Sequence, residues 1–175
     1  MTKIIHRFIN HNLNPATETL VIGTFNPETK DNKANFFYSR PRNFLWTIIP
    51  TIFNETSLKG NTLEEKLKFI EKYKIDFIDL ISEVDVNEVT NYNDGYLDSN
   101  VTVWRDVISE ISKLKNLKRV CFTRKSFGDI PRMKMKIDEI KNYCEVINIT
   151  FQFLITPARF YSQSKQSDWN MFFNK

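Results

Sequence analysis

Apolar residues gather in four short runs along the chain. In the segments between these runs, single apolar residues recur at helical spacing. A short apolar run bounded by turn residues predicts a buried strand. Such runs occupy residues 19–24, 75–81, 117–122 and 146–155, and the last has a clean period of two. We therefore predict four strands, with an edge strand or a short helix at residues 3–9.

Helical spacing of apolar residues predicts a helix in each intervening segment. Thr62 is placed to cap the second helix, while Pro50 is expected to kink or end the first and Pro131 to bend the fourth. Residues 82–100 are polar and rich in turn residues, so no element is predicted before residue 98. The predicted helices span residues 43–53, 62–73, 98–114, 125–143 and 168–173.

Strands that alternate with helices predict an α/β fold, a three-layer sandwich with a central, mainly parallel sheet of four strands. A length of 175 residues with 41% hydrophobic residues suits a single domain over residues 1–175. In such a sheet the loops after the first and fourth strands can face one cleft. Residues 26–43 are therefore expected to lie opposite residues 156–165.

Composition narrows the class of protein but does not select a function. A net charge of +4 favours a polyanion or nucleic acid without requiring one. Two cysteines are too few for a disulfide framework or an iron-sulfur site, and His6 and His11 lack companion ligands for a metal. No apolar run is long enough to span a membrane. We expect a soluble, cytoplasmic monomer with no metal and no cofactor.

The stretch at residues 20–46 has the layout of a ligand pocket. A buried strand breaks at Asn26-Pro27 and continues through a polar loop into Phe36-Phe37-Tyr38. It closes with Arg40-Pro41-Arg42-Asn43, at the start of a predicted helix. A strand that leads into a polar, aromatic-lined loop and then a helix start is typical of a binding site at the carboxyl end of a sheet.

Two loops of this chain resemble the motifs of the uracil-DNA glycosylase superfamily. The mismatch-specific uracil/thymine branch carries Gly-Ile-Asn-Pro-Gly and then Pro-x-Asn-x-Phe-Trp, and Asn26-Pro27 and residues 41–46 stand at matching spacing. Residues 37–46 resemble the Tyr-Tyr-Ala-His-Pro-Arg-Asn-x-Phe-Trp segment of the hypoxanthine branch. Residues 155–169 are similar to the second motif, a proline-containing loop that enters the minor groove of DNA.

The resemblance implies a catalytic role for two asparagines. The residue matching Asn26 positions a water molecule in the mismatch-specific branch, and the residue matching Asn43 carries catalysis in the hypoxanthine branch. From the residues alone, Asn26 before proline is also a common turn initiator, and Asn43 is also a plausible helix cap. Which asparagine would be the principal catalytic group stays open.

A glycosylase of this kind must flip a base out of the duplex and hold it. Aromatic side chains can stack on the extruded base, and basic side chains can bind phosphates. Arg159 and Phe160 fall at the wedge position of the second motif, although Phe160 suits the core equally well. The candidates for base binding are Phe25, Phe36, Phe37 and Tyr38, and those for DNA binding are Arg40, Arg42, Thr156, Pro157, Arg159, Phe160, Ser162, Ser164 and Lys165, with Lys125 as a further phosphate contact.

We therefore expect a DNA glycosylase that removes uracil or hypoxanthine by water attack, with DNA containing a deaminated or mismatched base as its partner. One alternative is a catalytically silent member of the fold that binds nucleic acid or a nucleotide. A small-molecule hydrolase is a third, disfavoured because no nucleophile with a base is evident. Asp79 and Glu83 are not adopted as an acid/base pair, since no second motif accompanies them.

Overall fold

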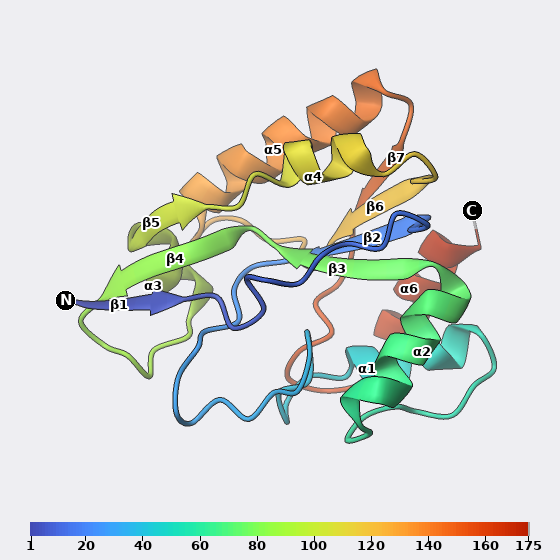
Figure 1. The fold of residues 1–175 in the computed structure, drawn as a ribbon, viewed down its shortest axis with the longest axis horizontal. Coiled ribbons are helices and arrows are strands. Elements are labelled where there is room, and N and C mark those ends of the chain that lie inside the picture. The colour runs from blue at the N-terminus through green and yellow to red at the C-terminus, as the bar shows by residue number, and fades with distance from the viewer. Residues whose placement is uncertain (175) are drawn as a thin grey trace.

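The four short apolar runs form one parallel sheet at the centre of the fold (Figure 1). The computed structural model describes residues 1–174, and this sheet has the order β3-β2-β6-β7. Gly23 pairs with Asp79, so the carboxyl ends of the two neighbouring strands β2 and β3 coincide. The predicted α/β fold with a parallel four-stranded sheet is confirmed. Its strands are β2 (Thr19–Gly23), β3 (Ile75–Asp79), β6 (Arg119–Phe122) and β7 (Thr150–Phe153).

Helices cover both faces of this sheet, as the three-layer prediction requires (Figure 1). One face carries α1 (Leu45–Ile52), α2 (Leu63–Tyr73) and α6 (Gln163–Phe173), and the other carries α4 (Val107–Lys113) and α5 (Pro131–Val146). Alternate residues of a strand point to opposite faces. Val21 accordingly packs with Trp46 and Trp169 in one apolar cluster, while Leu20 and Ile22 belong to the other.

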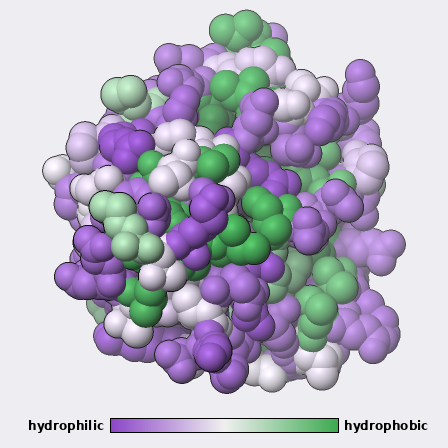
Figure 2. All heavy atoms as spheres, turned by 60° about the vertical axis from the view of Figure 1, so that its left-hand side comes forward, coloured by the Kyte–Doolittle hydropathy of each residue, from purple (hydrophilic) through white to green (hydrophobic). Residues whose placement is uncertain are grey.

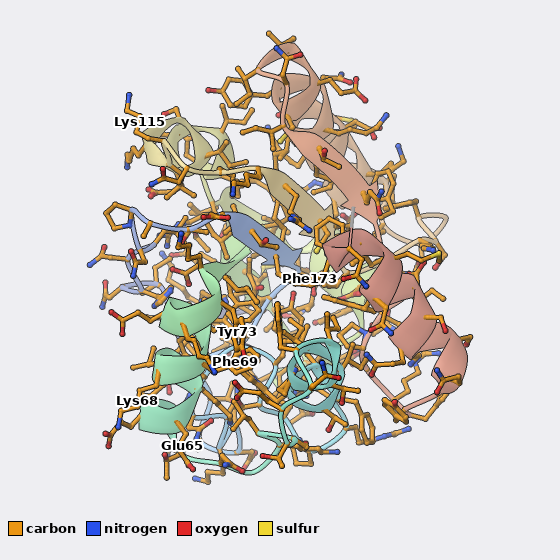
Figure 3. All side chains as sticks on the ribbon, turned by 90° about the vertical axis from the view of Figure 1, so that its right-hand side faces the viewer. Glu65, Lys68, Phe69, Tyr73, Lys115 and Phe173 are labelled. Carbon is orange, nitrogen blue, oxygen red and sulfur yellow. The ribbon has the colours of Figure 1, made fainter. Side chains whose placement is uncertain are left out.

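Helix α2 shows how local sequence and packing agree. Thr62 and Glu65 form a capping box at its start, as the predicted cap at Thr62 anticipates. Phe69 and Tyr73 point inward toward α1 and α6, whereas Glu65 and Lys68 point away from the protein (Figure 3). Phe53, just after α1, stacks on Tyr73 with ring centroids 3.9 Å apart. The apolar stripe of α2 therefore closes this side of the core.

A second sheet, antiparallel and of three strands, lies beside the first. Of its strands only the first, within the edge strand or short helix expected at residues 3–9, was anticipated. Its order is β1-β4-β5, from β1 (Thr2–Ile5), β4 (Ile81–Val86) and β5 (Val101–Trp104). The polar residues 82–100 thus contain most of β4 and all of α3 (Asp94–Ser99), and the helix predicted at residues 98–114 is a strand followed by α4. The prediction failed because β4 is stabilised by pairing with distant residues, Thr2 with Val86 for example, which local spacing does not reveal.

Three boundaries also differ from the predictions, each for a local reason. Pro131 is the first residue of α5 and does not bend it, because proline is well suited to a position that needs no N–H donor. The fourth strand is shorter than predicted, since α5 extends to Val146 and Asn148 has a positive φ of 58°. Helix α6 begins at Gln163, capped by the Ser162 hydroxyl.

Hydrophilic residues predominate on the face of the protein that Figure 2 shows. Figure 2 shows one face on which hydrophobic residues form only small, separate areas. Within residues 1–174, no helix has the length and apolar character needed to cross a membrane.

Candidate functional site

A cleft of about 560 Å³ opens at the carboxyl ends of β2, β3 and β6. Gly23, Asp79 and Thr123 line it from the ends of these strands, and residues from the loops 24–43 and 155–159 form its walls. The expected convergence of the two loops is therefore observed. The volume lies within the range of natural small-molecule sites.

The floor of the cleft is built around Gly23. A Cβ at this position would lie 2.3 Å from Oδ1 of Asp79 and 2.6 Å from the hydroxyl oxygen of Tyr38, so only glycine leaves both side chains in their observed positions. Burial, followed by the nearby charge of Asp79, raises the pKa of the Tyr38 hydroxyl well above its usual value. This hydroxyl lies 3.3 Å from the Thr123 hydroxyl. Tyr38 therefore stays neutral and can donate a hydrogen bond.

Lys66 of α2 holds the loop that carries Tyr38. Its ammonium donates to Oδ1 of Asn35 at 2.8 Å and to the Ser39 hydroxyl at 2.9 Å. Lys66 itself is only 1% exposed, whereas its partner Asn35 lies at the surface. Because Tyr38 lies between the two anchored residues, with a positive φ of 56°, the contact orients its ring toward the cleft.

Asp79 also lies on the floor, in a buried pair with His6. Nε2 of His6 lies 2.8 Å from Oδ2 of Asp79, and the backbone N–H of Phe8 donates to Nδ1 of the same ring at 3.0 Å. Nδ1 must therefore be the acceptor, which leaves the proton on Nε2 to be donated to Asp79. Neither residue was assigned to a site from sequence. The available signal was the position of Asp79 at the end of a buried strand.

Asn26 presents its amide nitrogen to the cleft. The backbone N–H of Ala34 donates to Oδ1 of Asn32, which makes the Asn32 nitrogen a donor to Oδ1 of Asn26 at 2.5 Å. The Asn26 oxygen is thereby occupied, and its Nδ2 has no protein partner within residues 1–174. With 5% of its surface exposed, Asn26 is a held hydrogen-bond donor.

Asn43 has a similar arrangement on the opposite loop. Its Oδ1 accepts from the backbone N–H of Leu45 at 3.0 Å. The N-cap residue of α1 is Phe44, which makes no side-chain cap bond, so Asn43 closes a turn just before the helix and is not its cap as predicted. Asn43 also lines the cleft and forms an isolated bridge with Ala158. Each asparagine oxygen therefore already accepts one hydrogen bond, whereas neither amide nitrogen has a protein partner within residues 1–174.

The aromatic candidates separate into two groups. Phe25 and Tyr38 line the cleft, but Phe36 and Phe37 are each 3% exposed and pack in the core beside Phe77. The expectation that Phe36 or Phe37 stacks on a ligand is corrected, because the fold uses both rings to fill the space under α1. Tyr92 also lines the cleft; it was missed because residues 82–100 showed only turn signals.

The second loop is attached directly to the first. Phe44 N–H donates to the Pro157 carbonyl at 2.9 Å, and Arg159 N–H donates to the Arg42 carbonyl at 2.7 Å. Thr156, Pro157 and Arg159 line the cleft. Phe160 is 60% exposed, so the alternative that it belongs to the core is wrong. The protruding loop, residues 158–161, thus stands at the cleft with an exposed ring.

Lys165 stabilises the protruding loop from inside. Its ammonium donates to the carbonyls of Ala158 at 2.7 Å and Phe160 at 2.8 Å, and only 4% of its surface is exposed. Burial lowers the pKa of this ammonium. The expectation that Lys165 contacts a DNA phosphate is therefore corrected, because its charge is already directed at backbone carbonyls.

The remaining polar candidates differ in whether they line the cleft and whether a protein group already pairs with them. Ser162 caps α6 and lies 3.0 Å from the Ser164 hydroxyl, and Lys125 pairs with Asp168 at 2.6 Å. Arg42 is exposed but does not line the cleft. Arg40 lines it and lies over the ring of Tyr92, 4.5 Å from its centroid.

One wall of the cleft is an ion-pair network that sequence reasoning missed. Arg124 donates to Oδ2 of Asp94 at 2.8 Å and also pairs with Asp129. Oδ1 of Asp94 accepts from the Thr24 hydroxyl at 3.0 Å, and burial raises the pKa of Asp94. The guanidinium of Arg124 is thus already paired with two carboxylates. Through Asp94, the first residue of α3, it connects this helix to the wall of the cleft.

Comparisons with known proteins support the fold. No protein-family model and no curated protein matches the chain. A solution structure from Methanosarcina acetivorans, provisionally described as a uracil DNA glycosylase, is similar with a TM-score of 0.62 and 18% identity, over 92% of this chain and 91% of that one. The cleft between two joined loops, at the carboxyl ends of a parallel sheet, thus lies in a chain with a uracil-DNA-glycosylase-like fold.

Proposed function

We propose that this protein is a DNA glycosylase that excises a deaminated base, uracil or hypoxanthine, by water attack. The observation that carries the proposal is the set of neutral donors facing one cleft: the amide nitrogens of Asn26 and Asn43 and the hydroxyl of Tyr38. Phe160 follows Arg159, which lines the cleft, and its ring is exposed. The fold similarity adds support at the level of architecture.

Neutral donors suit the chemistry of this bond. When the C1′–N bond breaks, its electron pair leaves with the base, and the sugar carbon gains positive character. Donors aimed at the base oxygens stabilise the negative charge that develops. Water forms the new C–O bond and loses a proton to solvent, while the base takes up a proton. Because their amide nitrogens have no protein partner within residues 1–174, Asn26 and Asn43 act in this scheme as donors, to the base or to the water oxygen, and not as bases.

The flipped nucleotide needs a protein surface that replaces it in the duplex. Phe160 and Arg159 are suited to enter the space left by the base, as apolar wedges do in other minor-groove binders. Arg40 and Arg42 supply charge for the flanking phosphates. The partner is DNA containing a deaminated or mismatched base, bound by a monomer.

The test is a cleavage assay on duplexes that carry uracil, hypoxanthine, xanthine or a G·T mismatch, scored as alkali-labile strand breaks. We expect cleavage of uracil or hypoxanthine DNA. Asn26→Ala and Asn43→Ala should each be compared with Asn12→Ala, an exposed asparagine outside the cleft. At least one should lower the single-turnover rate by about tenfold or more, the low end for a positioned catalytic group. If neither does, the proposed roles are wrong.

The alternative of a silent nucleic-acid- or nucleotide-binding protein is favoured by one observation. Asp79, Asp94 and Asp129 all line the cleft, and carboxylates disfavour the negative charge of a departing base. Tight binding of the same duplexes without cleavage of any of them would select this alternative.

A further inference from the structure

Asn32 is a buried neighbour of Asn26 that does not itself line the cleft. Only 8% of its surface is exposed. Its Nδ2 donates to Oδ1 of Asn26 at 2.5 Å and to the Pro27 carbonyl at 2.7 Å, and its Oδ1 accepts from the Ala34 N–H at 3.1 Å. The NH2 group of Asn32 thus has two acceptors and its oxygen has a donor, as is usual for a buried polar side chain.

These partners allow one orientation for each of the two amides. If the Asn32 amide were turned over, its oxygen would face two other oxygens and its NH2 group would face a backbone N–H. If only the Asn26 amide were turned over, two NH2 groups would face each other. Either change leaves buried donors and acceptors unpaired, which costs the desolvation of those groups. Asn32 therefore decides which end of the Asn26 amide is left for the cleft.

The main chain around this contact is held by other groups. The N–H of Asn32 donates to the Thr29 carbonyl at 3.2 Å. Arg7 donates from its backbone N–H to the Asn26 carbonyl at 2.7 Å and from its Nε to the Ala34 carbonyl at 2.9 Å. A change in the Asn32 side chain can therefore turn the Asn26 amide while these contacts keep the loop in place.

We propose that Asn32 is a positioning residue, which directs the NH2 group of Asn26 into the cleft and so makes Asn26 a hydrogen-bond donor to the ligand. The inference rests on the proposed function, which requires a donor at this place, and assigns a role to a residue outside the cleft. Asn43 is held differently, because its oxygen accepts from the backbone N–H of Leu45, which a change of side chain leaves in place.

Asn32→Asp reverses the contact at nearly constant size. The new carboxylate keeps the bond from the Ala34 N–H but has no hydrogen to donate, and it faces Oδ1 of Asn26 with an oxygen. Asn26 is expected to turn over, so that its NH2 group donates to the carboxylate and its oxygen faces the cleft. Single-turnover cleavage at saturating enzyme should fall by about tenfold or more, as when a positioned catalytic group is lost. An unchanged rate overturns the inference.

Asn32→Ala distinguishes orientation from a loosened loop. This change removes three hydrogen bonds, whereas Asn32→Asp keeps one of them, so a purely structural role would make Asn32→Ala the slower variant. The inference predicts the opposite order, because an Asn26 amide without a partner can adopt both orientations and retains part of the rate. A slower rate in Asn32→Ala than in Asn32→Asp contradicts the inference.

Arg7→Met is the matched control for the loop. It removes the side-chain bonds to Ala34 and Glu28 but leaves the side chain of Asn26 and its partner unchanged. We expect cleavage to slow by less than about threefold, as for the loss of a partly exposed pair. A loss equal to that of Asn32→Asp would show that any loosening of the loop has the same effect, and the inference would fail.

A double-mutant cycle tests whether Asn32 acts through Asn26. In the Asn26→Ala background, Asn32→Asp should change the rate by less than about twofold, whereas independent roles would multiply the two losses. If Asn32→Asp does not fold, Asn32→Ala provides the same test, because its loss must also disappear in that background. Multiplied losses overturn the inference.

Side-chain NMR tests the orientation without any cleavage. The NH2 signals of Asn26 are identified by their absence in Asn26→Ala. In wild type this group has no protein partner within residues 1–174, so its hydrogens should exchange rapidly with water. In Asn32→Asp they bond to the carboxylate and should exchange about tenfold more slowly, as expected for one hydrogen bond to a charged group. Equal exchange rates in the two proteins refute the positioning role.

The outcomes for the two proposals are distinct. Slower exchange in Asn32→Asp, together with no cleavage by wild type, supports the positioning of Asn26 and rejects the glycosylase function. Cleavage by wild type with equal exchange in both proteins does the reverse. Absence of both cleavage and a difference in exchange rejects both proposals.

Discussion

The chain contains two histidines, and each pairs with an aspartate of β3 at a different end of the strand. At the amino end, Asp76 accepts from His11 and from the Phe77 N–H at one oxygen, and from the Asn14 N–H at the other. At the carboxyl end, Asp79 accepts from His6 at one oxygen only. The same pair of residue types thus gives a saturated contact at one end and an available acceptor at the other.

This difference extends to the two ends of the central sheet. At the amino end Glu18, just before β2, binds Lys74 and Lys118. At the carboxyl end the available groups on Asn26 and Asp79 face an open cleft. Ligands of parallel α/β sheets bind at the carboxyl ends of the strands. The unpaired groups at that end face an open cleft, whereas the one fully buried side-chain polar atom without a partner within residues 1–174 is Oγ1 of Thr17, near the amino end.

The largest effect expected is from Asp76→Ala. It leaves three donors without their acceptor, at a residue that is 1% exposed. We expect a loss of about 3 kcal/mol in the free energy of unfolding, measured in urea, as for the breaking of a buried pair. Asp79→Ala should cost less stability, because fewer donors lose a partner. Equal losses would remove the distinction between the two ends.

Gly23→Ala should disrupt the cleft floor. The new methyl group would meet Asp79 and Tyr38 at 2.3 and 2.6 Å, so both must move, and we expect lesion cleavage to fall by about tenfold or more, as when a positioned catalytic group is lost. Gly128→Ala is the control, because a Cβ there meets nothing within 4 Å. Unchanged single-turnover kinetics in Gly23→Ala would mean that these two residues do not shape the active cleft.

Lys165→Met tests the protruding loop. Loss of the bonds to Ala158 and Phe160 should cost about 1 kcal/mol of unfolding free energy and weaken binding to lesion DNA. The slope of log binding constant against log salt should not change, because Lys165 contacts no phosphate. Arg40→Ala, by contrast, should reduce that slope by about 1. A reduced slope in Lys165→Met would restore the phosphate role.

The smallest effect concerns Glu18, at the amino end of the sheet. Hydrogen bonds from Lys118 and Lys74 lower its pKa from 4.5 to about 2. A lowered folded-state pKa stabilises the protein above pH 4.5, and this stabilisation is lost as the pH falls toward 2. Thermal unfolding should therefore show a smaller acid-induced loss of stability for Glu18→Gln than for wild type, with cleavage at neutral pH unchanged. Parallel pH profiles would contradict the assignment.

Local patterns were sufficient where neighbouring residues decide the structure. The apolar runs that form β2, β3 and β6 each lie within a few consecutive residues. The capping signal at Thr62 is equally local. An edge strand or a short helix was expected near β1, but β4 and β5 and the pairing of the small antiparallel sheet were missed because the partners lie far apart in the chain, as Val86 does from Thr2. Among site residues, the two loops were recognised by motif, but the burial of Phe36, Phe37 and Lys165 depends on what packs against them.

The sequence by itself determined the central parallel sheet, its helical layers and the two loops that form the cleft, because periodicity and motif spacing are local properties. Only the tertiary structure decided which groups in those loops are available. The occupied oxygens of Asn26 and Asn43, the internal bonds of Lys165 and the pairing of His6 with Asp79 all depend on residues brought together by folding. Whether a hydrogen-bond acceptor is available to a ligand depends on which protein donors folding brings next to it.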